Sequence, residues 1–341
     1  MKTRVLSSFA AIVLLSLAVT APCAARTSRS NVGEDALSLV PADAAAVAVV
    51  RFSELRSSPL AGNLFANADR ITADGDAARF LEDARLQPKK DVDTVVIAGM
   101  PSSGAGETPI LVLFEGRFDP ERLAAAAVGR GAELRTAPAG DYYLLPQKAE
   151  RGKKGAAAFV SHRLIIVGSE PEVIQALANR AAGGTGFTGG AGALGRQLSR
   201  IDRSASAWAL VDVSRHPFGR KGRANIHIER EGPSEPVVTL LGAMTSVSLF
   251  SLQANARGDA LELSIGGVCA DAETRQLIED SLKGLLAMWR LAAQEKSPEL
   301  VAALRRFAVT SGSDGISVKG TLPGSFLRAM ADKTQKHREQ Q

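Results

Sequence analysis

Cysteine and histidine are scarce in this chain, and their scarcity limits the chemistry it can perform. Its 341 residues include two cysteines and four histidines. No His-Glu-x-x-His, phosphate-loop or Gly-x-Ser-x-Gly motif occurs. His216 and His227 share one basic stretch without a nearby carboxylate cluster, while His162 and His337 stand apart. We therefore expect no metal ion and no cofactor, and the sequence favours a non-catalytic protein over an enzyme.

Long apolar runs are also missing beyond the first residues. A membrane-spanning helix needs roughly 20 apolar residues, and no later segment reaches that length. The chain begins with the parts of a secretory signal peptide: basic Lys2 and Arg4, an apolar run over residues 5–19, and small residues up to Ala25. We expect cleavage after Ala25 and export to the periplasm or outside the cell. The alternatives are an uncleaved membrane anchor and a lipoprotein with a lipidated Cys23, although Pro22 stands where lipoprotein signals carry a small residue.

Cleavage there would leave Cys269 as the single cysteine, so we expect no internal disulfide. It would also remove two cations and lower the formal charge from +5 to +3. A charge this small gives no reason to expect nucleic-acid binding. Apolar residues make up 45% of the chain and charged residues 23%, a composition typical of globular proteins.

The densest positive stretch lies in a predicted loop over residues 215–236. Such a loop could meet an anionic lipid surface, a polysaccharide or an acidic envelope protein. A solvated loop without a partner is the alternative. The cations of this candidate contact are Arg215, Arg220, Lys221, Arg223 and Arg230.

The order of predicted elements favours an α+β fold. Strands are expected over residues 93–99 and 109–116, followed by a helix that Asp119 caps and Pro120 begins. Ser169 and Glu172 have the spacing of a capping box before a later helix.

A similar order recurs further along the chain, which predicts an internal duplication. Residues 48–60 correspond to 209–218, residues 114–123 to 265–277, and residues 159–168 to 307–320. We expect two related halves, each a mostly antiparallel sheet with helices packed on it. The expected boundaries are a flexible lead-in (26–38), a first repeat (39–182), a Gly-rich linker (183–192), a second repeat (193–332) and a charged tail (333–341).

The glycine cluster and the two tryptophans have simple structural interpretations. Gly184, Gly186 and Gly189 match the letters of a dinucleotide-binding pattern, but a helix precedes them where that site needs a strand. Trp208 and Trp289 are expected in the core, Trp289 because it shares a helix side with apolar residues.

Hydrophobic patterns predict that the two sheets are buried differently. Residues 110–114 and 164–167 are continuous apolar runs, typical of strands covered on both faces. Residues 249–255 and 261–265 alternate, which indicates one face in water. That face is a candidate surface for a partner, and simple hydration is the alternative. Its polar residues are Ser251, Gln253, Asn255, Glu262 and Ser264.

Several stretches resemble a group of uncharacterised exported bacterial proteins built from a domain of unknown function. They are the Pro41-Ala42-Asp43 start, residues 55–60, residues 91–96, and Glu115-Gly-Arg-Phe-Asp-Pro120. The resemblance implies fold and export, and it carries over no catalytic residue. We therefore predict an exported protein that acts by binding or as an envelope component. The alternatives are a hydrolase whose site is assembled from scattered residues, and electrostatic adhesion through residues 215–230.

Overall fold

A computed structural model describes nine stretches of the chain. These are residues 36–57, 75–101, 108–146, 154–190, 192–215, 247–269, 271–294, 298–313 and 315–329. The expected signal peptide, residues 26–35 of the lead-in, and the charged tail lie outside the described residues.

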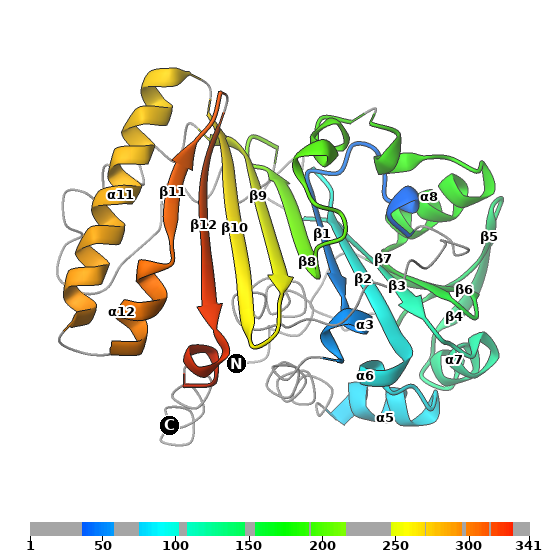
Figure 1. Cartoon of the computed structure of the whole chain (residues 1–341). Helices are drawn as coiled ribbons and strands as arrows, with labels where there is room; N and C mark the ends of the chain where they lie inside the picture. The colour runs from blue at the N-terminus through cyan, green and yellow to red at the C-terminus, as the bar shows by residue number, and fades with distance from the viewer. Residues whose placement is uncertain are drawn as a thin grey trace.

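The described strands form one twelve-stranded antiparallel sheet that runs through the whole molecule (Figure 1). Its order is β11-β12-β10-β9-β8-β1-β2-β3-β7-β6-β5-β4. The strands are β1 (Ala46–Arg51), β2 (Val92–Gly99), β3 (Ile110–Gly116), β4 (Glu133–Ala137), β5 (Gly140–Leu144), β6 (Gly155–Ser161), β7 (Leu164–Ser169), β8 (Ala207–Asp212), β9 (Val247–Ala256), β10 (Ala260–Cys269), β11 (Ala308–Ser311) and β12 (Gly315–Pro323).

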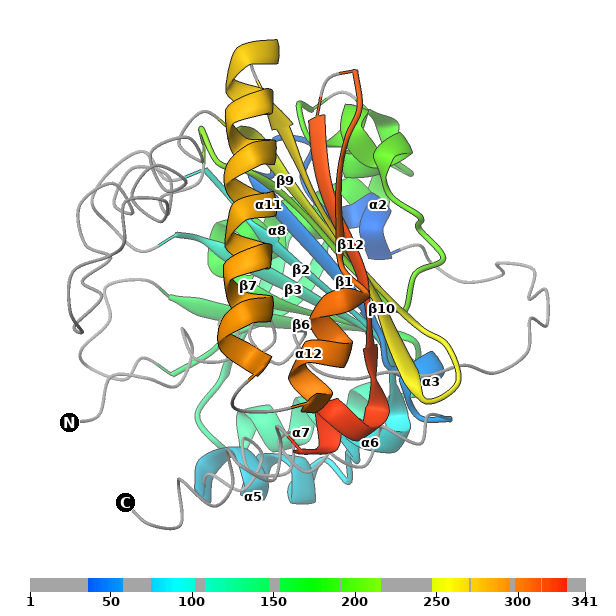
Figure 2. The same cartoon turned by 60° about the vertical axis from the view of Figure 1, so that its left-hand side comes forward.

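Helices cover parts of both sheet faces (Figures 1 and 2). They are α2 (Ala36–Leu39), α3 (Phe52–Leu55), α5 (Gly75–Asp83), α6 (Pro88–Asp91), α7 (Pro120–Val128), α8 (Glu170–Ala181), η1 (Gly186–Gly189), η2 (Gly195–Arg200), α11 (Ala272–Gln294) and α12 (Pro298–Arg305). The α+β class expected from the sequence is confirmed.

The two expected repeats do not have separate sheets, because β1 and β8 pair directly. Their register places Val49 opposite Trp208 and Val47 opposite Leu210. From this seam the order outward is β2, β3, β7, β6, β5, β4 on one side and β9, β10, β12, β11 on the other. The expected correspondence would match the first four strands of each side, and β5 and β4 extend the first side alone. The duplication itself remains a prediction.

Strands β2, β3 and β7 of the first half are covered on both faces, in agreement with the continuous apolar runs of β3 and β7, whereas β4 is mostly exposed. On one face, Leu111, Leu113 and Ile166 join the core cluster that includes α2, α8, η1 and η2. On the other face, Val95 and Ile165 pack with residues of α5 and α7. Apolar side chains are therefore needed at successive strand positions here.

The second half buries one face beneath α11 and α12. Ile278 of α11 packs with Ile316 of β12, and Leu282 and Leu285 lie against the same cluster. This cluster ends one turn before Trp289, which keeps 52% of its surface exposed. The expectation that Trp289 lies in the core is therefore wrong, whereas Trp208 is 1% exposed as expected.

Of the two predicted helix starts, the cap at Asp119 is confirmed and the capping box at Ser169 is not. Asp119 caps α7, because its Oδ1 accepts from the Arg122 backbone N–H at 3.1 Å, and Pro120 occupies the first turn. Ser169 precedes α8 but makes no side-chain cap hydrogen bond. Instead Glu170 of the first turn accepts a hydrogen bond from the Tyr142 hydroxyl at 2.7 Å. The capping box predicted with Glu172 is therefore wrong.

Two expected flexible segments are part of the core. The lead-in was expected to extend to residue 38, yet α2 begins at Ala36, and Ala36 and Leu37 are buried. In the expected Gly-rich linker, Phe187 is 0% exposed and its backbone N–H donates to the Val40 carbonyl at 2.8 Å. Gly186 has φ +41°, and a Cβ there would lie 2.0 Å from the Ser38 carbonyl oxygen. These glycines allow a close approach to α2, and they do not form a free linker.

Candidate functional site

The polar residues expected on one sheet face do share that face. In the β9–β10 register Gln253 lies opposite Ser264, and Asn255 opposite Glu262. Ser251 lies two residues before Gln253, so it points to the same side. We call this surface the polar face.

Two further strands extend the polar face beyond the predicted residues. In β12, Ser317, Lys319 and Thr321 pair with Gly266, Ser264 and Glu262 of β10. The alternation of apolar and polar residues over 316–322 is the signal that could have identified them. The face also reaches Thr310 of β11, whose hydroxyl lies 2.8 Å from that of Ser317.

Side chains of the polar face are half-buried, less open than the sequence suggested. Side chains on neighbouring strands partly cover one another. Intermediate exposure is therefore found at Ser251, Gln253, Asn255, Glu262 and Ser264. The described helices α11 and α12 pack on β10 and β12 over the opposite, apolar face, where Leu327 of the helical residues 324–329 also packs against Leu261.

Part of the polar face has hydrogen-bond partners within the chain. The Gln253 side-chain oxygen accepts from the Asp202 backbone N–H at 2.8 Å. Glu262 forms an ion pair with Arg257 at 3.1 Å, and the Arg257 side chain is 70% exposed whereas that of Glu262 is 44% exposed. The central positions around Ser264 and Lys319 thus offer hydroxyl and ammonium groups on a rigid surface. Such groups suit hydrogen bonding to a polar or anionic partner.

Most of the basic loop lies outside the described residues. Of its cations only Arg215 is described, half-buried, with its backbone N–H donating to the Asp212 carbonyl at 3.3 Å. Arg220, Lys221, Arg223 and Arg230 lie outside the described residues, as do His216, His227 and His337.

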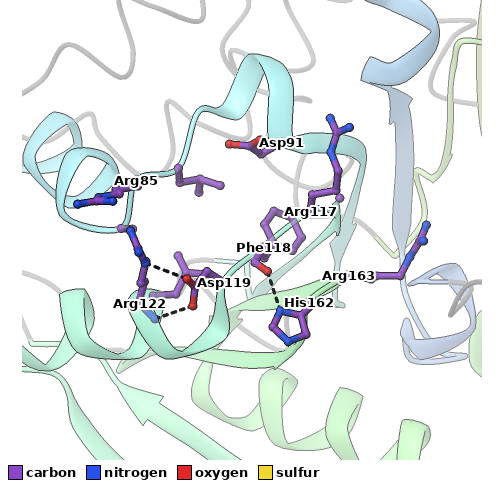
Figure 3. A pocket seen from close by; sticks show the side chains of 12 residues that line it. Arg85, Asp91, Arg117, Phe118, Asp119, Arg122, His162 and Arg163 are labelled. Carbon is purple, nitrogen blue, oxygen red and sulfur yellow. Dashed lines mark hydrogen bonds and ion pairs between the residues drawn. The ribbon is translucent and has the colours of Figure 1, made fainter.

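A cavity of about 480 Å³ lies beside the start of α7 (Figure 3). The loop after β3, the turn after α5 and the tip of the β6–β7 hairpin border it. Its charged and titratable residues are Arg85, Asp91, Arg117, Asp119, Arg122, His162 and Arg163.

Both carboxylates of this cavity have structural partners. Asp119 caps α7 and also forms an ion pair with the Arg122 Nε at 2.9 Å. Asp91 accepts from the Gln87 backbone N–H at 2.7 Å, at the start of α6. His162 Nδ1 lies 3.0 Å from the Phe118 carbonyl oxygen, which can only accept, so Nδ1 carries a proton. Within the described residues, neither carboxylate hydrogen-bonds to His162.

The remaining reactive groups are also in structural positions. Cys269 is buried at the end of β10, and burial raises the pKa of its thiol. A raised pKa keeps the thiol protonated and weakly nucleophilic. The described residues contain no group of three or more His, Cys, Asp or Glu that could hold a metal ion.

Comparison with known proteins identifies a shared fold and no family. No protein-family model matches the chain, and no curated protein matches it. Among solved structures, crystal form III of TP0453 has a TM-score of 0.50 at 10% identity, covering 88% of this chain and 99% of TP0453. Crystal form IV gives a TM-score of 0.46 at 10% identity over 86% and 96% of the two chains. The likeness to form III shows an α+β fold common to nearly all of TP0453.

Proposed function

We propose that this is an exported, non-catalytic bacterial protein that acts by binding, as a component of the cell envelope or of the periplasm. The observation that supports binding is the polar face, which continues across β9, β10, β12 and β11. Export is supported by the signal-peptide pattern of the first 25 residues. In the part of the chain that the structure describes, no helix is long and apolar enough to cross a membrane.

The polar face favours a polar partner over a small apolar ligand. It is a broad sheet surface with spaced hydroxyl, amide and charged groups, whereas small-molecule sites are concave and mostly apolar. An envelope protein or a polysaccharide can hydrogen-bond to several of these groups at once. The duplication is part of the same proposal: the two halves diverged, and the second kept one sheet face uncovered by described helices.

The test is capture of a partner from envelope extract by immobilised protein. Ser264→Arg places a long cation at the centre of the polar face, beside Lys319. Ser264→Thr keeps a hydroxyl there and favours a strand, so it is the matched control. We expect a partner that binds the parent and the Thr variant and is lost with the Arg variant, while circular dichroism shows all three folded.

Two results would reject the proposal. Capture that is the same with Ser264→Arg and Ser264→Thr would show that the polar face is not the binding surface. Turnover by the purified chain in a broad hydrolase screen would replace the binding function with the enzymatic alternative.

A further inference from the structure

The cavity beside the start of α7 combines an apolar lining with exposed cations. The buried residues that line it are all apolar: Ala84, Gly116, Phe118 and Leu123. Four exposed arginines also line it: Arg85, Arg117, Arg122 and Arg163. Its volume of about 480 Å³ lies within the range of small-molecule sites, about 300–1,000 Å³. Apolar walls beneath cationic groups match an organic molecule that carries an anionic group.

Positive charge exceeds negative charge in this cavity. Its lining contains four arginines and two carboxylates, besides His162. Asp119 compensates one arginine, because its Oδ2 pairs with the Arg122 Nε at 2.9 Å while its Oδ1 accepts from the Arg122 backbone N–H. Three arginines then remain with Asp91, which leaves a net charge of +2.

Three arginines of the cavity have no carboxylate partner among the described residues. The guanidinium groups of Arg85 and Arg163 make no hydrogen bond or ion pair with another described residue. Arg117 donates to the Lys90 carbonyl, a neutral group that leaves its charge uncompensated. Guanidinium groups bind carboxylates and phosphates through two parallel hydrogen bonds. A ligand can receive such bonds here without breaking an ion pair between described residues.

Arg85 occupies a backbone position that favours glycine. It follows the end of α5 with φ +50°, and it is the one non-glycine residue with positive φ among those that the structure describes. The Leu86 N–H donates to the Leu81 carbonyl at 2.9 Å, which closes the helix end in the way that glycine normally allows. An arginine is strained in this conformation, and its guanidinium binds no described residue. A role in binding explains this arginine where folding does not.

The wall that carries Phe118 is fixed in place by backbone contacts. The Gly116 N–H donates to the Arg163 carbonyl at 3.1 Å, and the Phe118 N–H donates to the His162 carbonyl at 2.8 Å. A Cβ at Gly116 would lie 1.9 Å from the Asp91 carbonyl oxygen, so the same loop also lies close against α6. The apolar wall is therefore formed before any ligand binds, as in most small-molecule sites.

We propose that this cavity binds a small organic anion, whose carboxylate or phosphate lies among the arginines and whose apolar part lies against Phe118. Figure 3 shows Arg85 and Arg122 on one side of Phe118, and Arg117 and Arg163 on the other. Side-chain rotamer changes on binding are common, so these exposed arginines can turn toward an anion from both sides. The cavity lies in the first half of the sheet and the polar face in the second. The proposal thus goes beyond the proposed function, and either can fail without the other.

Isothermal titration calorimetry of the full chain with four probes tests the class of ligand. Phenyl phosphate and benzoate join an aromatic ring to an anionic group, benzamide is the neutral counterpart of benzoate, and inorganic phosphate has no ring. We expect phenyl phosphate or benzoate to bind about tenfold or more tightly than benzamide and inorganic phosphate. The tighter of the two ring-bearing anions shows whether the site takes a phosphate ester or a carboxylic acid. The proposal is overturned if neither anion binds, or if benzamide or inorganic phosphate binds as tightly.

Variants of the cavity arginines test where the anion binds. Arg85→Gly removes the cation where glycine is unstrained, so the chain should unfold in urea close to the parent midpoint while its affinity for the tighter anion falls about tenfold or more. Arg163→Gln, at the β6–β7 hairpin tip, should also weaken binding. Arg306→Gln is the matched control, because Arg306 is an exposed arginine distant in sequence from the cavity, and it should change nothing. Affinity that both cavity variants leave unchanged, or that Arg306→Gln lowers equally, would overturn the proposal.

Discussion

Replacing Phe187 by alanine tests whether residues 183–192 are a linker or part of the core. Phe187 is 0% exposed and lies in the main core cluster with Leu39 and Leu194. Its backbone N–H also donates a hydrogen bond to the Val40 carbonyl, which holds η1 against α2. Removing the aromatic ring would therefore leave a cavity in the main core cluster.

The expected cost is large. Truncating a buried phenylalanine to alanine typically costs about 3–5 kcal/mol. Domains have about 5–15 kcal/mol of total stability, so the loss would be about a fifth of the whole or more. With a urea m-value of about 3 kcal/mol per molar, the unfolding midpoint should fall by about 1 M or more.

Urea unfolding followed by circular dichroism measures this shift. Thr185→Ala is the control, because Thr185 is exposed in the same segment and its loss should change stability by less than about 0.5 kcal/mol. A Phe187→Ala variant that unfolds within about 0.5 kcal/mol of the parent would refute the packing described here and restore the linker interpretation.

Three further perturbations have clear expected outcomes. Gly116→Ala should lower the free energy of unfolding by about 3 kcal/mol or more in the same assay, because the new Cβ would lie 1.9 Å from the Asp91 carbonyl oxygen. Gly75→Ala is the control and should be neutral, because its Cβ would lie 3.9 Å from the nearest neighbouring atom. Asp259 binds Arg328 through both oxygens at 2.7 and 2.8 Å, which lowers the pKa of the carboxyl below its ordinary 3.8. The stabilisation by the ionised Asp259 carboxylate is therefore complete above pH about 5 and is lost as the pH falls through the pKa of the folded chain. Asp259→Asn should lower the free energy of unfolding at pH 7 and leave it unchanged in strong acid. Equal effects at the two pH values would contradict this ion pair. Cys269 should react with a thiol reagent at pH 8 only after unfolding, since burial raises its pKa, and fast labelling of the folded chain would disprove its burial.

Local sequence signals correctly predicted elements in which side chains contact residues that are close to them in the chain. Asp119 and Pro120 specify the start of α7 because cap and backbone lie within one turn. The alternation over 261–265 predicted which residues of β10 share a face, because side chains of a strand alternate by geometry.

Long-range packing overrode the local signals elsewhere. Glycines near Phe187 are typical of a linker, but Gly186 admits the Ser38 and Val40 carbonyls, which are 148 and 146 residues away in the chain. Trp289 has the right helix spacing for burial, yet the cluster beneath α11 ends before it. The contribution of β12 to the polar face required its pairing with β10, which no local pattern states.

The β1–β8 seam has a consequence for how the chain folds. β1 is synthesised early and has β2 on one side, but its other edge waits for β8, which starts at residue 207. Until then, residues 46–50 present an uncharged edge of alanine and valine with free backbone groups. Such edges pair readily with other chains. A nascent chain is thus exposed to aggregation along the strand that later joins the two parts of the sheet, and a chaperone that covers that edge would protect it.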